Sequence, residues 1–402
     1  MTQRLARHPF VASYLVGLAA RLALAAFYVG HAGDTATYRA AAIAFRSSPL
    51  TSDDAFLRVP PLFPAYLALM PDDTVALVLQ VAIVSLIGPF LGIATVRHFG
   101  RTAGIVAAFV GALEPSFVFW SAYLLTDSFG AVFFALAIER TGSTLKSGAL
   151  RAAFAAGASL GLAWLTRAAY SLVAVVLALF SMLAPRLRIV RGAAVGVGLL
   201  LVLAIPATRN LVAIGEPTLY RTTPWQGVWA GTMWNEVGRG TIGVDIVMPP
   251  GFSARPLADQ EAFAREAALR FITDNPSRFA LLTMKKIFWF WLPAYPEWSL
   301  VHKLWSGSYF LVLYGLAIVG LARMRRSAFA WVLVASMIGL LIPVALTLVD
   351  YDGRYRLPAE VCLVPLAAAG ADPLLRRIRD LVAGYTTRGV GMGTMNRPPL
   401  ER

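Results

Sequence analysis

The chain has 402 residues, of which 58% are hydrophobic and only 14% are charged, and its formal net charge is +14. A soluble globular protein is typically about 45–50% apolar and about 25% charged. The excess of apolar residues lies in blocks of roughly 17–22 residues, the length at which a helix spans a bilayer. The composition therefore excludes a soluble enzyme and predicts an all-α, polytopic, integral membrane helix bundle.

The positive charge does not indicate nucleic-acid binding. The basic residues form short clusters between the apolar blocks, and no basic groove with interleaved aromatic residues is visible. Such clusters set the orientation of a chain in the membrane. The single cysteine, Cys362, rules out an intrachain disulfide bond and leaves the redox compartment open. The first apolar block has no small-residue cleavage site before a mature domain, so we expect a retained first span.

About ten spans are predicted from the apolar blocks. In chain order they cover residues 10–30, 75–96, 103–122, 124–139, 152–166, 169–184, 192–208, 307–322, 328–349 and 357–371. Basic clusters stand at every second boundary, at residues 4–7, 97–101, 140–151, 186–191, 323–326 and 376–379. The positive-inside rule places all of these clusters on the cytoplasmic side, together with both termini.

Two further apolar segments complicate the topology. Residues 55–70 contain three prolines, and residues 276–293 are aromatic and contain two lysines. Counting either segment alone as a span would move the cluster at 323–326 to the outer side, so both are predicted to be helices lying in the membrane interface. The outer side then carries the loops 31–74 and 209–306. We expect one transmembrane domain over residues 1–384 and a disordered cytoplasmic tail over 385–402.

Two aspartates stand at the boundary of the membrane on this outer side. Asp34 follows the first span in YVGHAGDTATYRAAA, and Asp127 lies in WSAYLLTDSF between two spans. A carboxylate at this depth has a desolvation cost and is a functional-site hypothesis by default. The pair could act as a general base and an orienting or metal-binding partner. The alternatives are a polar end of a span for Asp34 and a helix-terminus acid for Asp127.

Other polar residues lie on the same side. Tyr38 follows Asp34 by one helical turn and shares its face. Glu114 and Arg21 are predicted to form a structural ion pair between two spans. Arginines suited to bidentate phosphate binding are Arg58, Arg167, Arg209, Arg354 and Arg356. Headgroup snorkelling is the alternative for each arginine, although DYDGRYRLP packs two acids and two arginines into one turn.

Several motifs favour structure over chemistry. GASLG at 157–161 fits both a nucleophile pattern and GxxxG, and its place within a span favours helix packing. Gly192 and Gly196 have the same spacing. With four widely spaced histidines, no HExxH and no phosphate-binding loop, a zinc site and ATP-driven transport have no support. The residues Trp225, Trp229, Trp234 and Asn235 form either a sugar- or lipid-binding surface or an interface anchor.

Taken in order, these segments resemble the GT-C superfamily of membrane glycosyltransferases. The resemblance is strongest to the bacterial relatives of protein O-mannosyltransferases and of the aminoarabinose transferase, which are similar to glycosyltransferase family 39. It covers roughly residues 10–372. Its pieces are the acidic first loop with Asp34, the proline-rich VPPLFPAYLAL, the acidic motif at Asp127, and the arginine-bearing LAWLTRAAY, PATRNLVAIGEP and DGRYRLPAEVCLVPLAAAG.

The resemblance implies an enzyme that moves a sugar, with inversion, from a polyprenyl-phosphate carrier to a lipid, glycan or protein acceptor at the outer face of the bacterial inner membrane. It gives Asp34 the role of catalytic base and Asp127 that of an orienting partner. The phosphate is expected on Arg354 first, then Arg356, Arg209 and Arg58, with Tyr38 nearby. Thr35 stands where many relatives have a second acid. We therefore expect no required cofactor, with Mg²⁺ or Mn²⁺ at the two aspartates as the alternative.

A second reading of the same residues is a non-enzymatic transporter or flippase of a lipid-linked or anionic substrate. Such a protein would use the acids and arginines as a binding relay and would show related halves with polar residues at mid-membrane. Here the middles of the spans are nearly uncharged and the polar groups gather at one face. This distribution favours a one-sided reaction site.

Overall fold

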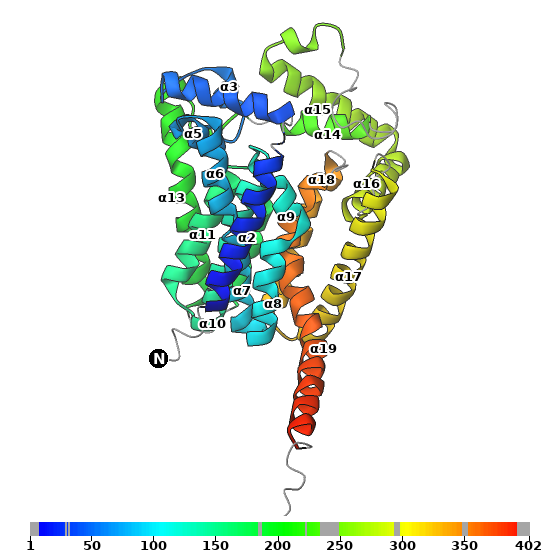
Figure 1. Ribbon diagram of the computed structural model, residues 1–402. Helices are drawn as coiled ribbons and strands as arrows, with labels where there is room; N and C mark the ends of the chain where they lie inside the picture. Colours follow the sequence, from blue (N-terminus) through cyan, green and yellow to red (C-terminus); the bar gives the residue numbers. More distant parts are fainter. Residues whose placement is uncertain are drawn as a thin grey trace, which may run out of the picture.

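The computed structural model describes residues 8–28, 30, 33–183, 187–221, 223–233, 249–292, 298–347 and 353–391. Over these ranges the chain forms helices and no named strand, which confirms the prediction of an all-α fold. Figure 1 shows long helices running side by side, with α3, α5, α14 and α15 lying across one end of the bundle. The N-terminal end of α2 and the C-terminal end of α19 both lie at the opposite end.

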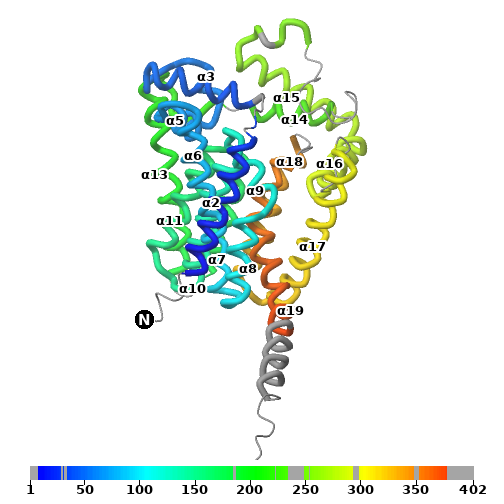
Figure 2. Tube along the Cα trace, in the orientation of Figure 1, coloured from blue at the N-terminus to red at the C-terminus, as the bar shows by residue number. Residues whose placement is uncertain are grey.

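The bundle contains most of the chain. Its helices are α2 (His8–Phe27), α6 (Asp73–Val84), α7 (Ile87–Phe99), α8 (Arg101–Leu113), α9 (Pro115–Trp120), α10 (Thr126–Ser147), α11 (Leu150–Trp164), α12 (Ser171–Ser181), α13 (Arg188–Ile214), α17 (Leu300–Met324), α18 (Ala328–Leu346) and α19 (Leu357–Gly391). The trace in Figure 2 shows α2 beside α8 and α9, and these helices are in contact.

The remaining helices belong to the two long connections and the short turns. They are α3 (Gly33–Ser47), α4 (Asp54–Leu57), α5 (Leu62–Leu69), α14 (Pro224–Thr232), α15 (Leu257–Asp274) and α16 (Pro276–Trp291), with the 3-10 turns η1 (Ala168–Tyr170), η2 (Phe252–Ala254) and η3 (Arg354–Arg356). The connection between α2 and α6 and the connection between α13 and α17 thus correspond to the two predicted outer loops.

Six helical stretches within the described ranges are long and apolar enough to cross a membrane. They are His8–Phe27, Asp73–Phe99, Arg188–Ile214, Leu300–Met324, Ala328–Leu346 and Arg354–Arg377. Three shorter apolar helices, Arg101–Leu113, Leu150–Trp164 and Ala168–Ser181, coincide with further predicted spans. Neither predicted interfacial helix is among these stretches. The membrane helix bundle is confirmed, and the total of about ten spans stays a prediction.

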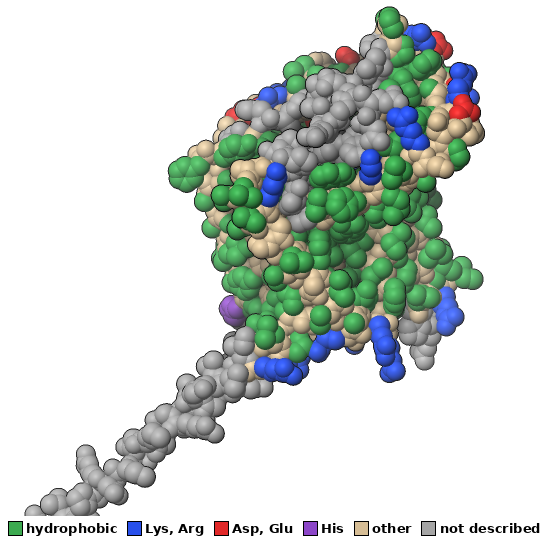
Figure 3. All heavy atoms as spheres, turned by 90° about the vertical axis from the view of Figure 1, so that its right-hand side faces the viewer, with side chains coloured by type: hydrophobic (Ala, Val, Ile, Leu, Met, Phe, Trp, Pro, Cys, Tyr) green, Lys and Arg blue, Asp and Glu red, His purple; other side chains and the backbone are tan. Residues whose placement is uncertain are grey.

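The outer surface has the pattern expected of a bundle in a bilayer. Figure 3 shows a broad hydrophobic belt across the middle of one face, with Lys and Arg at its lower edge and charges of both signs above it. On α17, large apolar side chains such as Leu311 and Ile318 are 74% and 68% exposed. Exposed apolar surface of this kind is stable only against lipid or another apolar partner.

One predicted span is broken. Residues 103–122 form α8 and the short α9, which meet at Glu114. Pro115 cannot continue the hydrogen bonding of α8, but it suits the first turn of a new helix. The Glu114 carboxylate accepts a hydrogen bond from the Phe117 amide over 2.7 Å and so caps α9.

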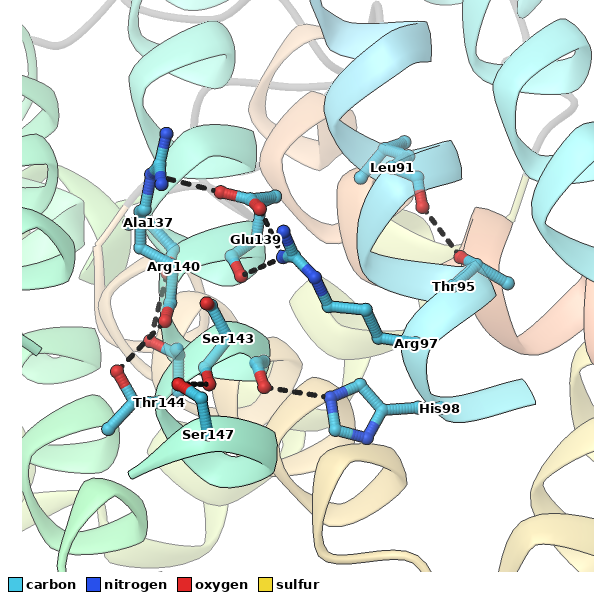
Figure 4. Close-up of polar contacts among 12 residues, drawn as sticks. Leu91, Thr95, Arg97, His98, Ala137, Glu139, Arg140, Ser143, Thr144 and Ser147 are labelled. Carbon is cyan, nitrogen blue, oxygen red and sulfur yellow. Dashed lines mark hydrogen bonds and ion pairs between the residues drawn. The ribbon is translucent and has the colours of Figure 1, made fainter. Parts of the chain in front are cut away.

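Arg97 and Arg140, which the sequence places on the cytoplasmic side, both form ion pairs at the lower end of the bundle. Figure 4 shows the Glu139 carboxylate between these two arginines. Arg97 pairs with Glu139, and Arg140 Nε lies 3.0 Å from it, while Glu139 itself is only 3% exposed. Next to this group, His98 Nε2 lies 2.9 Å from the Gly142 carbonyl oxygen. These contacts join α7 to α10 at the end of the bundle opposite α3.

Close helix packing through glycine is confirmed for GASLG. A Cβ atom on Gly157 would overlap the carbonyl oxygen of Val195 in α13, and one on Gly161 would collide with the Val202 side chain. The second pattern behaves differently, since Gly196 has open space around it and the close contact of α13 is made by Gly198. Small residues allow the two backbones to approach within van der Waals contact.

The last helix, α19, extends to Gly391 and so reaches into the segment 385–402, where the sequence predicts a disordered tail. The residues after Gly391 lie outside the described part of the chain.

Replacing Gly157 by alanine should destabilise the bundle by about 1–3 kcal/mol, because the added methyl group overpacks the α11–α13 contact. The measurement is the midpoint of thermal unfolding of the purified protein in detergent. Gly196→Ala is the matched control on α13 and should leave the midpoint unchanged or higher, because nothing lies within 4 Å of its Cβ position. Equal effects of the two substitutions would contradict the packing interpretation.

Candidate active site

A cavity of about 530 Å³ lies at the end of the bundle that α3 and α14 cover. Its walls come from α3, the start of α10, the segment between α11 and α12, the end of α18 and the turn η3. Asp34 and Asp127, which are far apart in the sequence, both line this cavity. The geometric requirement for a shared site is therefore met, and the chemical roles of the two residues stay predictions.

Asp34 is held at the mouth of the cavity by the backbone and by an arginine. Just before α3, the Gly30 amide donates to the Ala122 carbonyl over 3.1 Å, in an isolated bridge beside Tyr123. A Cβ on Gly30 would overlap the Tyr123 ring, so only glycine permits this approach. Arg354 Nη1 donates to Asp34 Oδ2 over 2.8 Å, and the Asp34 side chain remains half-exposed.

Asp127 lies deeper, in the first turn of α10. Its side chain is 3% exposed and forms an ion pair with Arg167, which is 18% exposed. The N-terminal end of a helix favours a negative charge, but the main partner here is the arginine from the α11–η1 connection. A buried carboxylate with a guanidinium partner avoids the cost of an isolated charge in an apolar environment.

Tyr38 lines the cavity with Asp34, as the helical spacing predicts. Its hydroxyl lies 3.2 Å from the Thr126 hydroxyl, and its ring packs edge-on against Phe63. Burial raises the pKa of the Tyr38 hydroxyl above its usual value. The group therefore stays protonated at neutral pH and is available as a neutral hydrogen-bond donor.

Tyr355 joins the two arginines. The Arg167 guanidinium carbon lies 4.5 Å from the centre of the Tyr355 ring, and that of Arg354 lies 5.0 Å from it. Arg354 Nη2 also donates to the Tyr355 hydroxyl over 3.2 Å. The turn begins at Gly353, whose φ of 78° lies in the left-handed region. The sequence analysis did not single out Tyr355, although it stands between the two arginines of the DGRYRLP landmark.

Arg356 was predicted to bind phosphate, but its side chain points into the bundle. It is 1% exposed and its Nε lies 2.8 Å from Glu360 Oε1, while its guanidinium stacks 4.0 Å from the Phe310 ring centre. In a 3-10 turn successive side chains point about 120° apart, so Tyr355 lines the cavity and Arg354 reaches Asp34 at its edge, while Arg356 points away from both. The prediction for Arg356 is corrected to a buried structural residue.

The structure also places Arg209 and Arg58 away from the cavity lining. Arg209 Nε donates to the Pro49 carbonyl over 2.8 Å, and its guanidinium also contacts Thr51 and thus holds the first loop. Arg58 lies 3.2 Å from Asp54 in an ion pair that is about half-exposed. Screened surface pairs of this kind contribute little to stability. Within the described part of the chain, neither arginine forms a hydrogen bond or an ion pair with Asp34, Asp127 or Tyr355.

The predicted ion pair between Arg21 and Glu114 is not formed in the described structure. Both side chains are buried, but Arg21 Nη1 donates to the carbonyls of Ala112 at 2.7 Å and Gly17 at 3.1 Å. Glu114 caps α9 instead. Because α8 ends at Leu113, the Ala112 carbonyl has no N–H partner within that helix, and the Arg21 guanidinium donates to it instead.

The predicted sugar- or lipid-binding surface in the second outer loop can be examined for Trp229. Trp229 is 7% exposed and packs against Phe252 and Phe263, so it is a core residue of the outer layer rather than part of a binding surface. Trp234 and Asn235 lie outside the described residues, as does Asp350 of the last outer turn.

The carboxylates do not fit a divalent cation in this arrangement. Each of them is already paired with an arginine, whose positive charge opposes a metal ion at the same oxygens. Within the described ranges, no three side chains of His, Cys, Asp or Glu converge as a metal-binding group. Mg²⁺ usually needs carboxylate and further oxygen ligands in an octahedral arrangement.

Comparison with known proteins gives a match to one family over part of the chain and a similarity of fold to solved structures. Residues 59–209 match the family described as dolichyl-phosphate-mannose-protein mannosyltransferase. No curated protein matches the chain. The matched segment contains the proline-rich landmark, Asp127, Arg167 and Arg209, while Asp34 and Arg354 lie outside it.

Among solved structures, the chain is similar to the oligosaccharyltransferase of Archaeoglobus fulgidus. The archaeal oligosaccharyltransferase AglB with an inhibitory peptide and a dolichol-phosphate has a TM-score of 0.57 and 15% identity, covering 100% of this chain and 53% of that one. The complex of the same enzyme with Zn and sulfate has a TM-score of 0.55 and 15% identity, and the match covers 96% of this chain and 51% of that one. The enzyme tethered to an acceptor peptide with the NVT sequon has a TM-score of 0.53 and 16% identity, and the match covers 98% of this chain and 52% of that one.

The chain thus spans about half the length of the solved chains that it matches. At this identity the structures establish the fold alone, and the matched family segment adds the sequence relationship. Together they confirm the resemblance of this chain to the GT-C membrane glycosyltransferases.

Proposed function

We propose that the protein is an inverting glycosyltransferase that moves a sugar from a polyprenyl-phosphate carrier to an acceptor hydroxyl. The observation that supports this most directly is one cavity, at one end of an apolar bundle, that is lined by two carboxylates and Arg167, with Arg354 paired to Asp34 beside it. The carboxylates can handle a proton, and the arginines can bind a phosphate ester. The apolar belt on the surface of the bundle fits a membrane that would hold the polyprenyl chain of the donor.

In the proposed reaction, Asp34 accepts the proton of the acceptor hydroxyl. The acceptor oxygen forms a bond to the anomeric carbon from one face, while the bond from that carbon to the phosphate oxygen breaks on the other face. The electron pair of the broken bond leaves with polyprenyl phosphate. Asp34 suits the role of base because its side chain is half-exposed and faces the open part of the site.

The arginines act on the leaving group. Negative charge grows on the phosphate oxygens as the sugar–phosphate bond breaks, and preorganised donors stabilise that charge. Arg354 and Arg167 are the two arginines that meet at Tyr355, so they replace the broader set expected from the sequence. Asp127, paired with Arg167, is placed to orient the sugar or the acceptor.

We further propose that the cavity opens on the outer side of the bacterial inner membrane, with both termini in the cytoplasm. The support comes from two observations. The N-terminal end of α2 and the C-terminal end of α19 lie at one end of the bundle. The cavity lies at the other end, under α3 and α14. Arg140 lies more than three turns along α10 from Asp127, which lines the cavity, and Arg97 of the last turn of α7 meets it there, so these two predicted basic residues lie at the end away from the cavity.

A transporter or flippase is the alternative function. It would need polar groups near the middle of the membrane on a path connecting both sides. The acids and arginines of the cavity instead meet at one end, which supports a one-sided reaction. A purified protein in liposomes that translocates a lipid-linked sugar without cleaving it would favour the transporter.

Asp34→Asn should reduce sugar transfer by at least about a hundredfold, because the amide cannot accept the acceptor proton. The measurement is the release of polyprenyl phosphate from a panel of polyprenyl-phosphate sugars by the purified protein. Asp73→Asn is the control, since Asp73 pairs with Arg39 at the surface and does not line the cavity. Full activity of Asp34→Asn in a protein that still folds would remove Asp34 as the base.

Arg354→Ala should lower kcat by about 10²–10³, the typical cost of removing one donor from a developing negative charge. Arg58→Ala should stay within about twofold of the wild type, because Arg58 pairs with Asp54 outside the cavity. Steady-state kinetics with a varied donor concentration separates the two effects. A larger loss for Arg58→Ala than for Arg354→Ala would reverse our placement of the phosphate.

Prolonged treatment with EDTA should leave the transfer rate within about twofold, since the arginine-paired carboxylates do not fit a divalent cation. The assay is the same release of polyprenyl phosphate, with and without added Mg²⁺ or Mn²⁺. A rate that falls with EDTA and returns only with one of these ions would establish a metal-dependent reaction.

A further inference from the structure

One neutral ring that lines the cavity, that of Tyr355, lies against two positive side chains. Arg167 comes from the α11–η1 connection and Arg354 from η3, and each guanidinium carbon lies within 5.0 Å of the centre of the Tyr355 ring. The face of an aromatic ring attracts a cation at this distance. Tyr355 is therefore the point where these two distant segments of the chain meet in the cavity.

The carboxylates and the ring hold the arginines in different ways. Asp34 and Asp127 pair with the charges of Arg354 and Arg167, so an incoming anion competes with each carboxylate for the same N–H groups. The Tyr355 ring is neutral and attracts the positive charge of each guanidinium, so the ring does not compete with an anion in the way that a carboxylate does. The ring can hold both arginines while an anion binds them.

We propose that Tyr355 is a positioning residue that holds Arg167 and Arg354 side by side, so that one phosphate group binds both guanidinium groups. This inference deepens the proposed function in one respect, because it takes the phosphate to be that of a polyprenyl-phosphate ester. The ligand class is a phosphate monoanion or dianion at the head of an apolar chain. Two planar guanidinium groups can supply paired N–H donors to such a group.

Two substitutions separate the ring from the hydroxyl. Tyr355→Phe keeps the ring and removes only the hydroxyl that accepts from Arg354 Nη2 at 3.2 Å. Tyr355→Leu keeps an apolar side chain, which is smaller, and removes the ring. The probe is polyprenyl phosphate bound by the full-length protein in detergent, and the matching polyprenol, which lacks the phosphate, reports on binding of the lipid chain alone.

We expect Tyr355→Leu to weaken polyprenyl-phosphate binding by about tenfold and to leave polyprenol binding unchanged. Tyr355→Phe should weaken it by about threefold or less. A wild-type affinity of Tyr355→Leu for polyprenyl phosphate would overturn the inference. An equal loss in both variants would also overturn it, because the hydroxyl rather than the ring would then be responsible.

A purely structural role for Tyr355 is tested by the same variants. If the leucine variant loses affinity for polyprenol as much as for polyprenyl phosphate, or unfolds at a clearly lower temperature than the phenylalanine variant, Tyr355 supports the fold and the positioning role is wrong.

Competition with inorganic phosphate distinguishes the sources of the anion. Competition that depends on Tyr355 supports a clamp for the phosphate group itself, and a lack of competition at concentrations far above that of the lipid contradicts it.

The proposed function and this inference can fail separately. In an active enzyme, Tyr355→Leu should raise the donor KM and lower kcat, since the phosphate is bound in the ground state and gains charge in the transition state. Phosphate binding that depends on the ring, without any sugar transfer, would support the positioning role of Tyr355 and contradict the proposed transferase function. Sugar transfer with unchanged kinetics in Tyr355→Leu would leave the transferase and remove the clamp.

Discussion

Charged side chains in an apolar bundle need partners within the protein, and this constraint organises the whole structure. Water is scarce in the bundle interior, so an unpaired charge would destabilise the fold by several kcal/mol. The buried Arg356 lies against Glu360, and Glu139 lies between Arg97 and Arg140. The first pair lies within one turn at the start of α19, and the second group joins α7 to α10.

The same constraint shapes the cavity. Asp34 and Asp127 each have an arginine partner, so the site is close to electrically neutral when no substrate is bound. The ion pairs hold both arginines in place when no substrate is bound. In the proposed reaction, a phosphate would compete with the carboxylates for these arginines, which already lie close to the developing charge. The ring of Tyr355 contributes to the same preorganisation without adding charge. A polar site can in this way exist at the end of a bundle whose surface is mostly apolar.

Much of the architecture and part of the candidate site were predictable from the sequence. The alternation of apolar blocks and basic clusters predicted a membrane helix bundle, and it placed Asp34 and Asp127 on one side, where the structure brings them to one cavity. The partners of buried charges were harder to predict. Spacing along a helix gives the face of a residue, but the choice of Glu360 rather than a phosphate for Arg356 depends on the 3-10 turn and on packing against α17. Arg21 likewise met free carbonyls at a helix break that the apolar pattern conceals.

The bridge between Gly30 and the strand-like segment at Tyr123 has a consequence for how the site can vary among proteins of this architecture. It fixes the point at which the chain leaves the bundle, a few residues before Asp34. The reach of the carboxylate is then determined by the number of backbone units after the bridge rather than by the identity of the intervening side chains, since each residue spans at most about 3.3–3.6 Å. An insertion or a deletion between Gly30 and Asp34 would change that number and would move Asp34 away from Arg354. The length of a short connection thus carries as much functional information as the acid that it presents.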